Sequence, residues 1–506
     1  MGEARFGSWK SWTTPHMMRS AWKSGPAIAL TVHSQKLLPE GRSETRCLIA
    51  AFNYSSFAAV KNLVSALPHW FIIIAFALCC GACGGTVSRP AAPPPAPAPP
   101  AASAPDSSEA EAVEGTIRFL EERVKKDPED FIALNKLNGY YLQRAQESGD
   151  VRYLELAARA ARDSLKSIPA EMNPGGLAGL AQTVHNLHDF AAARDHALKL
   201  TQLEPRKSYP QRILGDALLE LGDYDRAEEA YRRMQKLNNF ESTLTSEVRL
   251  ARVDQLRGRP EVARKRFEQA LLLALDQVPQ QREVVAWCRW QLGEAAFARG
   301  DYAVAEQHYR DALVTLPDYY RATASLARVQ AANGDLNSAI AGYEKVVKQL
   351  PDPSFVAALG DLYKLAGRER EAASQYALVE QIARLSELNG ALYNRQLALF
   401  YADHDMKAAE AYALAKREYE LRRDIYGADA LAWTALKAGK LDEAQSAIKE
   451  ALRLNTEDAK LFYHAGMIAR AAGDRDAARA YLSRALKLNP KFDPLQSPLV
   501  EKALAG

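Results

Sequence analysis

Apolar positions recur with helical spacing from about residue 109 to the end of the chain. The same region is rich in Ala, Leu, Glu, Lys and Arg, and it lacks the alternation of apolar and polar residues that indicates a strand. The pattern therefore predicts an all-α body over residues 109–495, followed by a short C-terminal tail over residues 496–506.

Within this body, a six-residue segment that begins with Gly or His and ends with Ala recurs. The copies begin at Gly222, Gly258, Gly300, Gly334, Gly367, Gly439, Gly473, His188 and His404. With a tenth, degenerate unit near Ala157, neighbouring alanines lie 33 to 42 residues apart. Such a period is typical of stacked helix pairs, because one pair cannot bury its apolar face alone.

Other positions fall into phase with each anchor alanine. A small residue such as Gly215 stands twelve positions before it, a bulky residue such as Tyr231 stands four after, and Pro often stands twelve after. We expect the segment's Gly to end the first helix in the left-handed conformation and the following Asp to cap the second. The longest interval, between Ala263 and Ala305, predicts a lengthened second helix or loop near residues 271–284 and a kink there.

This phased pattern resembles the tetratricopeptide repeat, a helix–turn–helix unit of about 34 residues. The resemblance covers residues 110–492 and implies a right-handed α-solenoid of about nine to ten repeats. It also implies that the first helices line a concave groove that binds other proteins or peptides. The carboxylate clamp of heat-shock adaptors does not carry over, because Tyr140 stands where the clamp needs Asn, although Lys136 is present.

The family's inward-facing positions give a set of candidate partner-binding residues. They are Tyr209, Arg212, Arg252, Trp287, Trp290, Arg328, Asn394, Tyr401, Trp433, Tyr463 and Arg470. Aromatic and Arg side chains are the ones most enriched at interface hot spots, which favours a binding role. The alternative is that some of them pack against a neighbouring repeat or a terminal helix.

The body carries no catalytic motif, such as HExxH, a nucleophile elbow or a phosphate loop. We therefore expect a protein that is not an enzyme, with no cofactor, metal or small-molecule substrate. His185 and His188 lie three positions apart and could begin a zinc site, which keeps an enzymatic hypothesis open. We expect a structural role for both, for His404 in its turn, and for Cys288 as a core thiol.

Charge excludes one class of partner. The chain has 65 Lys and Arg against 62 Asp and Glu, and the small excess lies within residues 1–61. A nucleic-acid-binding body needs a concentrated basic footprint, so we expect no nucleic-acid partner.

The N-terminal region resembles an export signal that is displaced from the start of the chain. An apolar run over residues 70–82 is too short to span a membrane and ends in Gly81-Ala82-Cys83, which resembles a bacterial lipobox with Cys80 where Leu is usual. A start at Val60 would make residues 60–82 a signal peptide and residues 1–59 a misread extension. Residues 83–108 would then be a lipidated cysteine and a Pro/Ala-rich linker.

These features predict a lipoprotein of the bacterial cell envelope, anchored to the membrane by Cys83. Gly84 follows the cysteine, where an Asp would signal retention in the inner membrane, so we expect the periplasmic face of the outer membrane. The alternative is a cytoplasmic or organellar adaptor or co-chaperone whose N-terminal extension is genuine and whose apolar run is buried or anchors the chain.

Overall fold

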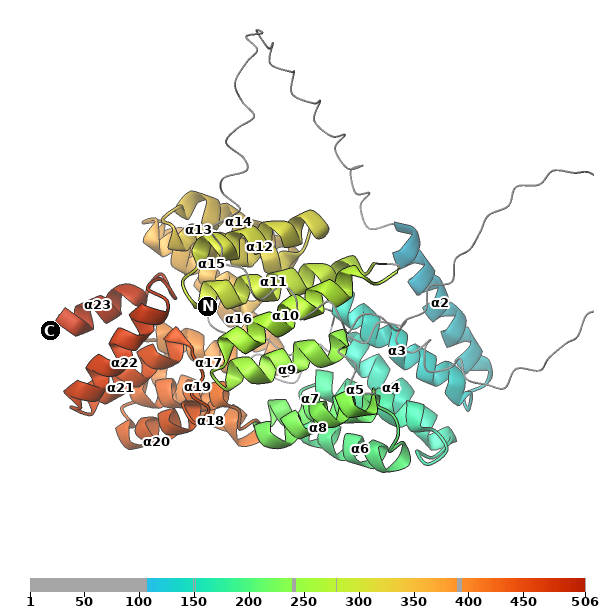
Figure 1. The fold of residues 1–506 in the computed structure, drawn as a ribbon. Coiled ribbons are helices and arrows are strands. Elements are labelled where there is room, and N and C mark those ends of the chain that lie inside the picture. Colours follow the sequence, from blue (N-terminus) through green and yellow to red (C-terminus); the bar gives the residue numbers. More distant parts are fainter. Residues whose placement is uncertain are drawn as a thin grey trace, which may run out of the picture. The chain divides into compact units, whose positions relative to one another are not determined.

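Helices make up all the regular structure in the part of the chain that the computed structural model describes, residues 107–506 without 149, 151, 239–242, 279, 389–393 and 506. This region contains 22 α-helices, labelled α2 to α23 (Figure 1). The all-α prediction is therefore confirmed. Cys83, the apolar segment, the linker and the extension over residues 1–59 lie outside the described residues.

Ten helix pairs follow one another along the chain. The first five are α3 (Phe131–Ser148) with α4 (Arg152–Ser167), α5 (Pro174–Asn186) with α6 (Phe190–Leu203), α7 (Tyr209–Glu220) with α8 (Tyr224–Leu237), α9 (Leu244–Leu256) with α10 (Pro260–Leu275), and α11 (Arg282–Ala298) with α12 (Tyr302–Thr315). The next five are α13 (Tyr320–Ala332) with α14 (Leu336–Gln349), α15 (Pro353–Leu365) with α16 (Glu369–Leu388), α17 (Asn394–Asp403) with α18 (Ala408–Leu421), α19 (Ile425–Lys437) with α20 (Leu441–Ala451), and α21 (Ala459–Ala471) with α22 (Arg475–Leu488). Helix α2 (Ser107–Lys126) precedes the pairs, and α23 (Ser497–Ala505) follows them.

The two helices of a pair pack closely, and each pair packs on the next. Several consecutive first helices also contact one another, as α15, α17, α19 and α21 do, whereas consecutive second helices make weaker contacts or none. The first helices therefore lie on the inner side of the curved stack. None of the described helices combines the length and apolarity that crossing a bilayer requires.

The turns inside the pairs behave as their glycines predict. Seven of these glycines have φ between 65° and 88°, and His188 takes the same conformation with φ of 65°. Asp189, Asp223, Asp335 and Asp474 each cap the second helix by accepting a hydrogen bond from a backbone N–H three residues on. The sequence therefore located both the helix ends and most of the caps.

The turn after α17 differs from its prediction. His404 was expected to adopt the left-handed conformation, but Asp405 and Lys407 do so instead, with φ of 54° and 43°. The connection over residues 404–407 is one residue longer than the three-residue connections inside the other pairs. The buried anchor of this unit is Ala411 rather than Ala409.

The predicted lengthening between Ala263 and Ala305 is distributed over three elements. Helix α10 has 16 residues where α8 and α12 have 14, a loop over residues 276–281 follows, and α11 has 17 residues where α9 and α13 have 13.

Close crossings inside the pairs depend on the predicted small and bulky residues. A Cβ added to Gly215 or Gly293 would lie under 3.0 Å from the ring of Tyr231 or Tyr309, sixteen residues later in the paired helix. The same holds for Gly360 beneath Tyr376. Each aromatic ring therefore fills the space that the glycine of its own pair leaves open.

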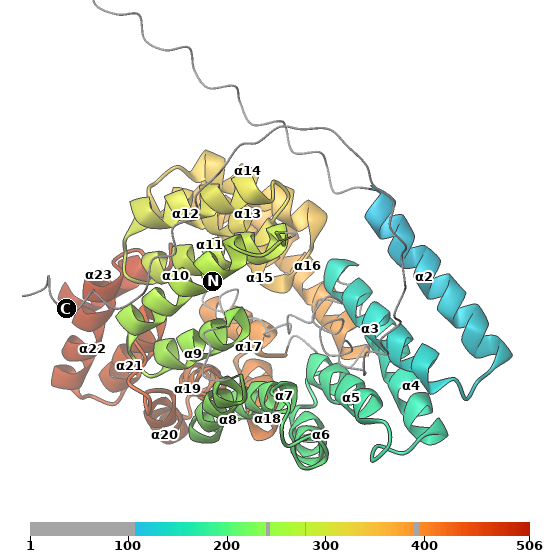
Figure 2. The same cartoon turned by 45° about the vertical axis from the view of Figure 1, so that its right-hand side comes forward.

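The chain returns on itself late in the sequence. Figures 1 and 2 both show α18 to α20 beside α8. The backbone N–H of Ile425 donates to the Tyr224 hydroxyl over 2.9 Å, and the Asn489 amide donates to the carbonyl of Phe297 over 2.7 Å. Between these two contacts, the Thr456 hydroxyl donates to the carbonyl of Leu256. Three successive turns of the early repeats, in the pairs from α7 to α12, thus contact three successive loops of the late repeats, those that follow α18, α20 and α22.

Candidate functional site

The inner helices carry the residues for which a binding role was predicted, and most of these side chains are buried. Trp287 is 7% exposed and Trp290 is 4% exposed, both on α11. Trp290 donates its indole N–H to the Ser325 hydroxyl over 2.9 Å, and Trp287 packs against the ring of Phe267. Both indoles therefore join neighbouring repeats, and their role in partner binding remains a prediction.

The predicted arginines are likewise engaged by neighbouring helices. Arg212 donates to Gln182 and Asp216 over 3.2 and 3.3 Å. The guanidinium carbon of Arg252 lies 5.7 Å from the ring centroid of Tyr426, a residue of the late repeats. These side chains hold the stack together at the positions where a groove ligand was expected.

Late in the stack, Trp433 and Tyr463 belong to one aromatic cluster. Trp433 stacks on the imidazole of His464, with centroids 4.3 Å apart, and donates its indole N–H to Asp403 over 2.8 Å. Tyr463 packs against Trp433 and Phe492. Burial would raise the pKa of Asp403, but the Lys460 ammonium, 2.9 Å away, holds that pKa well below its usual range.

Four predicted residues have other surroundings. Tyr209 is half-buried and donates its hydroxyl to Glu204, and the Tyr401 hydroxyl accepts from Lys407 over 3.1 Å. Asn394 is the first residue of α17, and its side chain is outside the described part. Arg470 on α21 is exposed, unlike the other members of the predicted set whose side chains the structure describes.

A buried polar pattern that the sequence analysis missed joins successive repeats. In α7, Asp216 accepts hydrogen bonds from the Tyr231 hydroxyl of the paired helix and from the Arg249 guanidinium of the next first helix, over 3.0 and 2.7 Å. Burial would raise the pKa of Asp216, yet the Arg249 charge lowers it below its usual value. The carboxylate is therefore ionised and paired, as a buried charge must be.

The same arrangement returns twice along the stack. Glu294 accepts from the Tyr309 hydroxyl over 2.7 Å and from Arg328, whereas Asp361 accepts from Tyr376 over 2.8 Å. The imidazole of His404 lies 2.7 Å from Asp361 and takes the place of the arginine. The signal was present in the sequence, since an acid follows the small Gly in Gly215-Asp216, Gly293-Glu294 and Gly360-Asp361.

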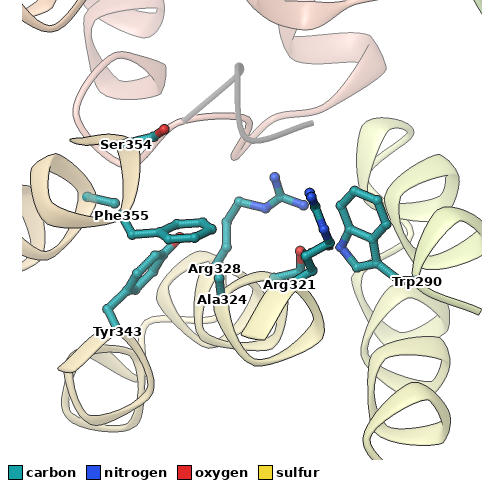
Figure 3. A pocket seen from close by; sticks show the side chains of 9 residues that line it. Trp290, Arg321, Ala324, Arg328, Tyr343, Ser354 and Phe355 are labelled. Carbon is teal, nitrogen blue, oxygen red and sulfur yellow. Dashed lines mark hydrogen bonds between the residues drawn. The ribbon is translucent and has the colours of Figure 1, made fainter. Parts of the chain in front are cut away.

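A pocket opens between α11, α13, α14 and α15 (Figure 3). The residues that line it are Trp290, Arg321, Ala324, Ser325, Arg328, Tyr343, Ser354, Phe355 and Ala358. Figure 3 shows the guanidinium groups of Arg321 and Arg328 between Trp290 on one side and Phe355 with Tyr343 on the other. Of the predicted residues, the pocket brings Trp290 and Arg328 together.

The residues that could have supported catalysis have structural surroundings. The Cys288 thiol is buried, and burial raises its pKa to about 12, so it remains protonated. His185 is buried with neither ring nitrogen hydrogen-bonded in the described part, and its ring packs edge-on against Phe190. No cluster of three or more His, Cys, Asp or Glu suited to a metal ion occurs among the described residues.

Comparison with known proteins identifies the repeats. Models of the tetratricopeptide repeat match residues 242–314, residues 296–362, and residues 180–242 and 430–491. These ranges correspond to α5 to α15 and to α19 to α22.

Two curated relatives are similar over part of the chain. The TPR repeat-containing protein YpiA of Bacillus subtilis (strain 168) is 25% identical over 281 residues, which are 54% of this chain and 62% of YpiA. Cellulose synthase operon protein C of Xanthomonas axonopodis pv. citri (strain 306) is 27% identical over 206 residues, which are 39% of this chain and 13% of that protein. The chain thus spans less than two thirds of either relative.

Among solved structures, two crystal structures of MamA are similar to part of the chain. They are 22% and 20% identical, cover 33% and 36% of this chain and 93% of MamA in each case, and have TM-scores of 0.27 and 0.28.

Ten stacked helix pairs with glycine turns and close Gly–Tyr crossings define an α-solenoid repeat protein. With the family matches on the same helices, the chain is a tetratricopeptide repeat protein.

Proposed function

We propose that this protein is a non-catalytic scaffold that binds polypeptide partners along the face formed by the first helices of its repeats. The observation that carries the proposal is the series of ten helix pairs from α3 to α22, with the first helices on the inner side. Stacked repeats of this kind create extended concave binding surfaces.

We also propose that Cys83 is lipidated and tethers the repeats to the bacterial envelope, at the periplasmic face of the outer membrane. The lipobox-like Gly81-Ala82-Cys83 and the Pro/Ala-rich linker support this proposal. Both curated relatives are bacterial proteins, which agrees with it. A cytoplasmic adaptor with a genuine N-terminal extension is the outcome that would replace it.

Site-specific photocrosslinking tests the binding face. A photoreactive amino acid is placed at Arg470 on the first helix α21 and, as the matched control, at Arg479 on the second helix α22, since both positions are exposed. We expect polypeptide adducts from position 470 and few or none from position 479. Equal adducts from both positions, or none from either, would contradict the proposal.

Exposed Arg470 gives a cleaner test than the buried tryptophans. Replacing Trp287 and Trp290 by Ala would remove side chains that connect repeats, so a loss of partner capture would also reflect a loss of stability.

The N-terminal peptide and its mass, measured on natively produced protein, test the tether. We expect a chain that begins at Cys83 and carries acyl groups. Peptides from residues 1–59 would instead show a genuine extension and would direct the search for partners to the cytoplasm or an organelle.

A further inference from the structure

The pocket between α11 and α15 is positively charged and walled by aromatic rings. Its lining includes two arginines and no Asp or Glu. Its space is about 390 Å³, a figure that includes the open mouth. This is near the lower end of the range for ligand pockets, which favours a side chain or two over a large ligand.

Arg321 enters this pocket with no ion-pair partner among the described residues. Its guanidinium carbon lies 5.4 Å from the ring centroid of Trp290 and 5.1 Å from that of Tyr320. Glu283 and Asp352 act on it only through space, and none of the described carboxylates forms a salt bridge or hydrogen bond with it. Several other arginines of the inner helices are paired with a carboxylate, as Arg249 is with Asp216 over 2.7 Å.

Arg328 adds a second observation. It is 5% exposed and bonds to Glu294 through Nη2, yet its buried Nε has no hydrogen-bond partner in the described part of the chain. An unsatisfied buried donor costs about 1–3 kcal/mol, and an acceptor that enters the pocket would relieve that cost. Arg321 therefore offers a guanidinium with no carboxylate partner among the described residues, and Arg328, already paired with Glu294, offers one unsatisfied donor.

We propose that this pocket binds the carboxylate of an Asp or Glu side chain in a polypeptide partner, with Arg321 as the principal donor and an adjacent apolar residue against Phe355 and Tyr343. A guanidinium binds a carboxylate through two parallel hydrogen bonds, which a lysine does not reproduce. A chain terminus would also need donors for its backbone, and the lining contains no Asn or Gln. The proposal rests on the proposed scaffold function and names the chemical group that the inner face would bind.

Three short peptides test this assignment, each fluorescently labelled and measured by anisotropy with the full chain. The first two are blocked at both ends and differ only in a central Glu or Gln, which is followed by Phe. We expect the Glu peptide to bind at least tenfold more tightly than the Gln peptide, and Arg321→Gln to reduce this preference to less than twofold. Arg321→Lys should retain only part of it.

Arg310→Gln is the matched control, because it removes the same charge from the outer helix α12, where the side chain is 59% exposed. It should leave the preference unchanged. Circular dichroism and the unfolding midpoint of Arg321→Gln establish that the variant is folded. Equal binding of the Glu and Gln peptides, or no binding of either to the native chain, would overturn the proposal.

The third peptide has the central Gln and a free C-terminal carboxylate. If this third peptide binds most tightly, the pocket binds C-terminal carboxylates and the assignment to an Asp or Glu side chain is wrong. The crosslink at position 470 separates the two proposals. If crosslinking persists while the Glu preference is absent, the pocket assignment alone fails; if both are absent, the scaffold function fails with it.

Discussion

Two sets of glycine turns, alike in sequence and backbone, have different surroundings. A Cβ added to Gly222 or Gly258 would lie less than 3.0 Å from the backbone carbonyl of Arg423 or Asn455, respectively. A Cβ added to Gly334 or Gly439 would meet nothing within 4 Å. All four have positive φ. The first set therefore requires glycine both for the left-handed conformation and for space against the late repeats. The second set requires glycine for the conformation alone.

The difference shows that a repeat's local signature does not reveal its tertiary role. Each turn segment encodes a helix end in the same way, because the left-handed residue and the following helix are local requirements. The small rotation between repeats accumulates along the stack, and it determines which turns the late repeats contact. The following experiments separate the two contributions.

Substitution of the turn glycines by Ala should give the largest contrast. Gly439→Ala should cost about 1–2 kcal/mol of unfolding free energy, because Ala must adopt the left-handed conformation. Gly222→Ala should cost about 1–3 kcal/mol more, because its methyl group also collides with the carbonyl of Arg423. Urea unfolding midpoints measure both, and equal losses would mean that the late repeats do not press on this turn.

Anchor alanines should not distinguish the two sets. Ala305 follows the contacted turn at Gly300 and Ala339 follows the open turn at Gly334, yet both are completely buried inside their own pairs. Changing either to Leu should cost about 1–3 kcal/mol by overpacking. Ala303→Leu is the control, since Ala303 is exposed on the same helix as Ala305, and it should change stability by no more than about 0.5 kcal/mol. A much larger loss at Ala305 than at Ala339 would contradict this view.

A smaller change in stability should measure the contact between the early repeats and the late repeats directly. The Tyr302 hydroxyl donates to Asn489 over 2.6 Å and accepts from the backbone N–H of Lys491 over 3.0 Å. In a double-mutant cycle, Tyr302→Phe and Asn489→Ala should couple by about 0.5–1.5 kcal/mol, the net value of a hydrogen bond. Tyr363→Phe, whose hydroxyl bonds to Glu344 instead, should show no coupling to Asn489. Additive losses for Tyr302 would show that this contact is not formed in solution.

Sequence reasoning reached the helix pairs and their turns because these depend on residues within about 35 positions of one another. The sequence also contained a signal for the contact between early and late repeats that the sequence analysis did not use. The second residue after the turn glycine is Tyr224 or Tyr302 in two contacted turns, whereas it is Leu336 or Leu441 in two open turns. Both tyrosine hydroxyls accept a backbone N–H from the late repeats.

The candidate site could be predicted only in part. Family positions gave Trp290 and Arg328, which lie on the first helices α11 and α13, but they gave no measure of burial, which depends on the side chains of the next repeat. They also missed Arg321, which we propose as a carboxylate donor because no described carboxylate forms a salt bridge or hydrogen bond with it. No pattern within one helix records such an absence.

Two histidines should give the smallest effect and opposite signs. Burial lowers the pKa of His185, which lies near Asp216, Glu220 and Arg212, although the two carboxylates oppose this shift. Below its unfolded pKa of about 6.5, the unfolded chain binds a proton that the folded chain resists, so His185 reduces stability as the pH falls. His185→Gln should therefore make the loss of stability below about pH 6.5 shallower.

His404 should behave in the opposite way. Burial lowers its pKa, but the Asp361 carboxylate, 2.7 Å from its Nε2, outweighs burial and raises that pKa above the usual value. The stabilisation from its protonated form is complete below the unfolded pKa and is lost as the pH rises through the folded pKa. Unfolding midpoints between pH 5 and pH 8 should thus show His404→Gln furthest below the native chain at the acidic end, with the gap narrowing toward pH 8. A gap that widens with pH would mean that Asp361 does not hold a charged imidazole, and that the third acid–tyrosine unit differs from the two that use arginine.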